Sequence, residues 1–215
     1  ITLSGGTPTV TGNTITSTTP IKIADPDAQT SGFSGNTYSG SNPKIQIYGT
    51  LDGTRTLNPV ESLAKYYISA SNLTVASGAT LTIPAGIEVE NTDINYSLIV
   101  YGTLNANGVT FSGSWNRISV QNGGRADFTN CTMTGGSSSN IYYGSGSSGT
   151  LDNVHGSNGW VLYVYSSSVS ITNGITVGSL ILSAPITVLN GTINSLSISA
   201  SATVTGCTIG QIMLS

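Results

Sequence analysis

The chain is poor in charge, and this excludes several classes of protein. Only 7% of its 215 residues are charged, and the formal net charge is -3. Six Lys and Arg cannot form a basic patch that would neutralise phosphates, so we expect no nucleic-acid partner. The acidic pairs Asp25 with Asp27 and Asp52 with Glu61 do not match the spacing of a calcium loop. We therefore expect no metal and no cofactor.

Long apolar runs are missing as well. The longest, at 161–164 and 180–182, have the length of a strand and fall far short of the roughly 18 residues that indicate a membrane span. The chain is nevertheless 38% hydrophobic, and this content combined with low charge argues against disorder. These properties indicate a folded chain with no membrane span.

The first residue and the sequons favour an extracellular setting. The chain starts at Ile1 and not at Met, which suggests a secreted form from which a signal peptide was removed. Asn-X-Ser/Thr sequons begin at Asn72, Asn95, Asn130 and Asn190. We favour glycosylation at Asn72 and Asn95, because these two lie near strand ends while the other two belong to the column described next.

The chain is rich in Ser, Thr, Gly and regularly spaced Asn. Short apolar-alternating segments follow five asparagines that recur along the chain: Asn107, Asn130, Asn153, Asn173 and Asn190. Intervals of roughly 20 residues are typical of one turn, or coil, of a solenoid. Asn tolerates a left-handed backbone, and its amide can bond to the Asn of the next coil. The asparagines therefore predict an all-β fold, a parallel β-helix with an Asn ladder along one corner.

Alternating apolar residues between the corners predict three short strands per coil. One coil has its inward residues within 98–111, and the next repeats the pattern at 118–133. The coils shorten toward the C-terminus, so the cross-section should narrow there. We expect the regular β-helix to cover 58–215. Residues 1–57 are expected to form irregular early coils or a small head, with a long loop at 25–44.

Two structures remain open for the start of the regular region. Asn58, Pro59 and Glu61 match the cap, first-turn and capping-box positions of a helix that would extend to Tyr67. The alternative is a strand at 65–68 that leads toward Asn72. The sequence favours neither.

Two segments resemble secreted right-handed parallel β-helix proteins of bacterial and archaeal cell surfaces. Residues 66–86 read YYISASNLTVASGATLTIPAG, and residues 97–111 read SLIVYGTLNANGVTF. Together with the later Asn-Cys-Thr-Met and Asn-Gly-Thr-Ile phrases, the resemblance covers roughly residues 65–210. It implies a right-handed solenoid. It leaves the function open, because that family includes adhesins, surface-layer and filament proteins, and polysaccharide-active enzymes.

The best catalytic candidates are Asp127 and Asp152, which lie one coil apart on the second strand, with Arg125, His155 and Arg117 nearby. Paired carboxylates beside a basic group suit the cleavage of glycosidic bonds. However, the chain has only nine acidic residues, and both aspartates also fit positions that flank turns. We therefore expect no enzyme, and keep a polysaccharide-binding or polysaccharide-cleaving β-helix, with glycans as partners, as the alternative.

Outward positions form two kinds of column. The third strands present a row of threonines interrupted by His155, which is compatible with ice binding, but a second parallel row is missing and makes this function less favoured. The first strands present Tyr142 and Tyr163, with Tyr165 and Trp160 nearby. Such a stripe indicates a contact surface for another protomer, a sugar polymer or the loop 25–44.

Both ends of the chain fall within apolar-alternating strands, which contain Ile1 and Leu3 at one end and Ile212 and Leu214 at the other. Uncapped solenoid ends can stack head to tail, and such stacking gives an open polymer. We therefore predict a homopolymer, in which this chain is the structural subunit of an extracellular surface filament or appendage.

Overall fold

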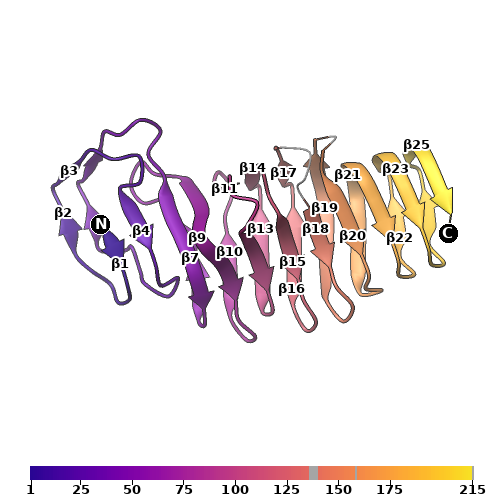
Figure 1. Cartoon of the computed structure of the whole chain (residues 1–215), viewed down its shortest axis with the longest axis horizontal. Coiled ribbons are helices and arrows are strands. Elements are labelled where there is room, and N and C mark those ends of the chain that lie inside the picture. Colours follow the sequence, from indigo (N-terminus) through magenta and orange to yellow (C-terminus); the bar gives the residue numbers. More distant parts are fainter. Residues whose placement is uncertain (136–139, 158, 215) are drawn as a thin grey trace.

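The computed structural model describes residues 1–135, 140–157 and 159–214, and all of its regular elements are β-strands. The strands pair in parallel and stack as a β-solenoid of about 8 turns (Figure 1). Each coil contributes to three faces, which we number in the order in which the chain passes through them. The predicted all-β solenoid is confirmed, and the described residues contain no helix.

Face one carries the aromatic stripe. Its strands pair in chain order, and they are the second part of β7 (Ile45–Leu51), the second part of β9 (Lys65–Val75), β12 (Ser97–Val100), β15 (Arg117–Val120), β18 (Asn140–Tyr143), β20 (Val161–Val164), and the last parts of β21 (Val169–Leu182), β23 (Thr192–Ile198) and β25 (Thr208–Leu214).

Face two carries the two aspartates. Its strands also pair in chain order, and they are β8 (Thr54–Thr56), β10 (Thr80–Ile83), β13 (Thr103–Asn107), β16 (Arg125–Thr129), the first part of β19 (Ser148–Gly156), the first part of β21, β22 (Thr187–Leu189) and β24 (Thr203–Thr205).

Face three runs the full length of the molecule. It begins with β1 (Thr2–Leu3), β4 (Ile21–Ile23) and the first parts of β7 and β9. It continues through β11 (Glu88–Asn91), β14 (Thr110–Gly113), β17 (Thr132–Met133), the end of β19, the middle of β21, and the first parts of β23 and β25. Two small parallel pairs flank its start: β2 (Val10–Thr11) with β5 (Phe33–Ser34), and β3 (Thr14–Ile15) with β6 (Thr37–Tyr38).

The N-terminal residues are therefore stacked on the same solenoid. Strands β1, β4 and β7 pair in sequence, so residues 1–57 lead directly into face three. Within 25–44, where the sequence indicates a loop, the short strands β5 and β6 pair with the preceding coil.

Alternating burial fixes the core. In β14 and β16 the inward residues Phe111 and Phe128 are fully buried, and their rings meet edge to face with centroids 5.7 Å apart. Trp115 packs against Phe111 in the same way at 5.8 Å. A shift of one residue would exchange the buried and exposed sets, so this alternation holds the register of every coil.

The cross-section narrows near the C-terminus. Along face three, Thr110 pairs with Thr132, and these two positions bound one coil in the middle of the chain. Thr176 pairs with Thr192, and Thr192 with Thr208, so each of the last two coils takes up less of the chain. This agrees with the shortening seen in the sequence.

One corner repeats a left-handed backbone, as the asparagines predict. Asn130, Asn153, Asn173 and Asn190 all have positive φ, between 51° and 55°. The prediction that Asn107 belongs to this column is wrong, because Asn107 pairs with Thr129 and its φ is not positive. The corner position in that coil belongs to the next residue, a glycine with φ of 65°.

Of the two structures left open for the start of the regular region, the helix from Asn58 to Tyr67 is contradicted and the strand at 65–68 is confirmed. Val60 and Leu63 form a tight bridge between them, and Glu61 has a φ of 56° that a right-handed helix cannot accept. From Lys65 onward the chain is strand β9, in which Tyr66 is buried. Pairing of β9 on both sides, with β7 and β11, outweighs the local capping pattern.

Candidate functional site

The catalytic candidates are spread over three faces. Arg117 lies on face one, where its guanidinium covers the ring of Tyr142 at 4.7 Å. Asp127 lies on face two, and His155 lies on face three. The structure therefore does not gather these groups around one position.

The two aspartates are offset. Asp127 pairs with Thr150 of the next coil, whereas Asp152 pairs with Thr129. With ~4.8 Å between strands and ~3.3 Å per residue, this diagonal is roughly 8 Å between Cα atoms. Asp127 accepts two hydrogen bonds from Arg125, at 2.6 and 2.8 Å. Each acid thus has its own neighbours.

Asp152 and His155 instead take part in the corner network. Asn173 Nδ2 donates to Asp152 Oδ1 at 2.6 Å, and Asn153 Nδ2 donates to Asn130 Oδ1 at 2.7 Å. The ring of His155 lies with Nε2 2.9 Å from Asn153 Oδ1 and with Nδ1 3.2 Å from the Thr176 hydroxyl. The ladder is thus a mixed chain of amides, a carboxylate and an imidazole.

In the aromatic stripe on face one, the tyrosine rings lie against one another. The ring centroid of Tyr142 lies 6.3 Å from that of Tyr163 and 5.3 Å from that of Tyr165. Tyr165 is 39% exposed. Trp160, which the sequence placed in this stripe, is buried instead. It precedes β20 and packs inward among Met133 and other core residues.

The loop 25–44 does not cover this cluster. Phe33 is buried near the N-terminus, Asn36 accepts and donates hydrogen bonds with residues of neighbouring N-terminal coils, and Lys44 forms an ion pair with Glu90. Several coils separate these contacts from β18 and β20, which carry Tyr142 and Tyr163 (Figure 1). Of the three occupants that the sequence leaves open for the stripe, the loop 25–44 is contradicted by these contacts.

The two ends of the solenoid differ. At the C-terminal end, Ile212 and Leu214 are 56% and 78% exposed. At the N-terminal end, Ile1 is exposed, but Leu3, which the sequence assigned to the interface, is buried because β1 lies over β4. Among the described residues, β25 pairs only with β23, and β1 only with β4.

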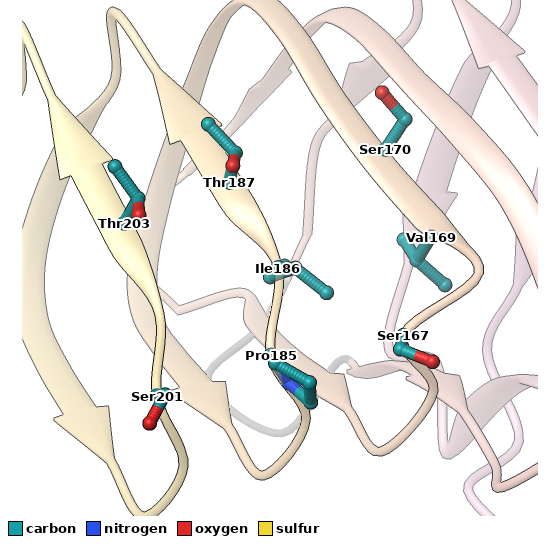
Figure 2. Close-up of a pocket in the computed structure, with 8 residues that line it drawn as sticks. All are labelled: Ser167, Val169, Ser170, Pro185, Ile186, Thr187, Ser201 and Thr203. Carbon is teal, nitrogen blue, oxygen red and sulfur yellow. The ribbon is translucent and has the colours of Figure 1, made fainter.

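Two shallow grooves that the sequence does not predict lie along one corner. One, of about 310 Å³, lies beside Tyr165 at the corner between faces one and two. The other, of about 450 Å³, continues along the same corner (Figure 2). Their lining consists of Ser, Thr, Pro and a few apolar residues. Ser and Thr are common throughout the chain, so the repeat of these corner residues does not stand out in the sequence, and only the folded chain reveals the grooves.

The fold and these surfaces define a β-solenoid protein with a tyrosine cluster on face one, grooves along its corners and an exposed apolar end. Comparison with protein-family models, with curated proteins and with solved structures gives no match. In the described part of the chain, no helix is long and apolar enough to cross a membrane.

Proposed function

We propose that this chain is a structural subunit that assembles end to end into an extracellular surface filament or appendage. The observation that carries the proposal is the exposure of the last coil. Leu196 and Ile212 occupy the same inward column, yet Leu196 is 1% exposed and Ile212 is 56% exposed. One further coil would bury Ile212 and Leu214, each worth about 1.5–3 kcal/mol if burial were complete.

A second copy is the occupant that fits this end. Among the described strands of face three, β1 is the first and β25 the last, and each has one unpaired edge there, so β1 of one copy can extend the column of another. The low charge of the chain leaves little electrostatic repulsion against such pairing. The first coil, from Thr2 to its partner Lys22, is longer than the last, so the two cross-sections differ. We therefore expect the contact to be strongest along face three.

The extracellular setting is part of the same proposal and is supported by the sequons. Asn95 is exposed in the loop between β11 and β12, where its side chain and backbone amide bond to Asp93. Asn72 is half-buried, and its Oδ1 accepts a hydrogen bond from the Ser97 amide. Asn95 is therefore the more accessible of the two favoured sites for a glycan.

The test is electron microscopy and sedimentation of the purified chain. We expect filaments in the parent. A charge at the buried junction should be strongly unfavourable, so Ile212→Lys should give monomers. The control is Ile94→Lys, which places the same charge on a 62%-exposed side chain of a loop far from both ends and should still assemble.

Two results would refute the proposal. The first is a parent that stays monomeric at every concentration. The second is a mass that stops at two copies, since that would mean that two like ends pair with each other and close the assembly.

A further inference from the structure

Three tyrosines form a platform on face one and the corner that joins it to face two. We name Tyr142, Tyr163 and Tyr165 the tyrosine platform. Arg117 covers the ring of Tyr142 at 4.7 Å, and this cation–π contact helps to hold the ring in place. A Cβ added to Gly144 would lie 3.1 Å from Tyr142 Cε1, so that ring leans over the corner toward Tyr165.

A hydroxyl-lined groove starts at this platform. Tyr165 itself lines the smaller groove, together with Ser145, Ser168 and Ser183. Ser167 and Pro185 line both grooves, so the two form one continuous track. Figure 2 shows how the track then crosses successive coils, with the corner residues Ser167, Pro185 and Ser201 in one row and three hydroxyl-bearing strand residues, Ser170, Thr187 and Thr203, beside them.

The chemistry of the lining restricts the ligand. Among the described residues, no charged side chain lines either groove. Hydroxyl groups both donate and accept hydrogen bonds, as do the hydroxyls of a sugar. An exposed tyrosine ring offers an apolar face against which the C–H face of a pyranose can pack, with a polar tip beside it. The linear run over several coils suits a chain of sugars better than a single small molecule.

We infer that this track, the tyrosine platform and the joined grooves, binds a neutral, linear polysaccharide. Binding is expected to be weak and additive along the track, because the grooves are shallow and supply many neutral contacts without a deep pocket. The inference does not depend on end-to-end assembly, since the track lies along the side of the solenoid and leaves both ends uncovered.

The test is electrophoresis in native gels that contain hydroxyethylcellulose, glucomannan or dextran, compared with gels that contain polygalacturonate and with gels without polysaccharide. All samples carry Ile212→Lys, so that assembly, or its failure, cannot alter mobility. We expect at least one neutral polysaccharide to retard the chain, and polygalacturonate to retard it less.

Matched variants assign the effect to the platform. Tyr165→Ala should weaken binding about tenfold, whereas Tyr165→Phe keeps the ring and should retain most of it. The control is Tyr101→Ala. Residues 100, 120, 143 and 164 pair in succession, so Tyr101 lies at the same corner as Tyr165, three coils earlier. Tyr101 is 45% exposed, but it lines neither groove.

Any of three results would overturn the inference. The first is the absence of retardation in all neutral gels, and the second is retardation by polygalacturonate alone. The third is an unchanged Tyr165→Ala variant. A fall in the sedimenting mass of the assembly-competent chain on Tyr165→Ala, without a change in the gels, would assign the platform to a contact between copies.

Discussion

The left-handed corner shows how one backbone requirement is met by two residue types. For a residue other than Gly or Asn, this conformation costs roughly 1–2 kcal/mol. Glycine meets the requirement at Gly206, where a Cβ would also lie 2.4 Å from Asn190 Oδ1. Asparagine meets it at Asn153 and adds a bond to Asn130. The column is therefore defined by conformation first and by amide bonding second.

We expect Asn153→Ala to destabilise the fold more than Asn153→Gly. Both variants lose the side-chain hydrogen bonds to Asn130 and His155, about 1–2 kcal/mol in total, and alanine adds the cost of positive φ, about 1–2 kcal/mol. Asn107→Ala is the control and should change stability by no more than about 0.5 kcal/mol. Urea unfolding, followed by the fluorescence of buried Trp115 and Trp160, measures the three variants. Equal losses for Ala and Gly would contradict the role of φ.

A second residue-scale prediction concerns pH. Glu61 accepts hydrogen bonds from the Asn36 amide at 2.6 Å, from Asn36 Nδ2 at 3.1 Å and from the Tyr38 hydroxyl at 2.8 Å. Desolvation acts to raise the pKa of Glu61, but these bonds outweigh it and hold the pKa below 4.5. Because the pKa of Glu61 is lower in the folded state, the unfolded chain binds the proton more readily. The stability that Glu61 contributes is therefore complete above pH 4.5, and it is lost as the pH falls through the pKa of the folded state.

The comparison with Glu61→Gln checks this sign. The parent should resist proteolysis within 33–38 better than the variant at pH 7, and the difference should shrink as the pH falls below 4.5. If the difference in proteolysis stays the same down to pH 3, or grows, the charge of Glu61 does not stabilise residues 33–38.

At the scale of elements, the early coils depend on a buried arginine. Arg55 occupies an inward position of β8 that pairs with Leu81, and its Nη1 donates to the carbonyls of Pro26, at 2.8 Å, and Ala28. Desolvation lowers its pKa, against the opposing effect of Tyr66 and nearby acids. The arginine thereby ties the segment that follows β4 to the next coil.

We expect Arg55→Leu to cost about 1–3 kcal/mol, because it fills the core position but leaves the two carbonyls without their donor. Amide hydrogen exchange should rise within 24–30. The matched control is Arg125→Leu, which removes an arginine whose side chain is 50% exposed and whose partner Asp127 lies on the same strand. Its cost should stay within ~1 kcal/mol. A similar loss of stability in both variants would contradict the role of Arg55 in joining the two coils.

Sequence reasoning works for the elements that repeat and fails where they do not. Alternation and corner spacing predict the coils between 98 and 214, since each strand meets the same surroundings as the one before it. The sequence does not distinguish Asn107 from Gly108 as the corner residue, because both residue types can form the corner. The pairing of Thr110 with Thr132 assigns the corner to Gly108. Trp160 precedes β20 and lies outside the strand alternation, so the sequence does not indicate its burial. Arg55 takes an inward strand position where the alternation favours an apolar residue, so its charge argues against the burial that the structure shows. The corner grooves depend on how the corners of successive coils lie beside one another, which only the folded chain shows.

At the scale of the molecule, the solenoid is nearly one-dimensional. Each coil contacts only the coils before and after it, so stability is close to a sum of coil and neighbour terms. Among the described coils, the last one pairs with a single neighbour, has a short circumference and consists mostly of exposed residues. It should therefore open before the central coils, and it is also the surface that the proposed assembly covers.

Hydrogen exchange can measure both the early opening of the last coil and its coverage by assembly in one experiment. In the Ile212→Lys monomer we expect amides of β24 and β25 to exchange faster than those of β16, because local opening at an end requires the loss of one interface and not two. In parent assemblies β25 should become protected along with β1, while β16 stays unchanged. Protection that appears along face one instead would place the contact between copies on the side of the solenoid and contradict stacking through its ends.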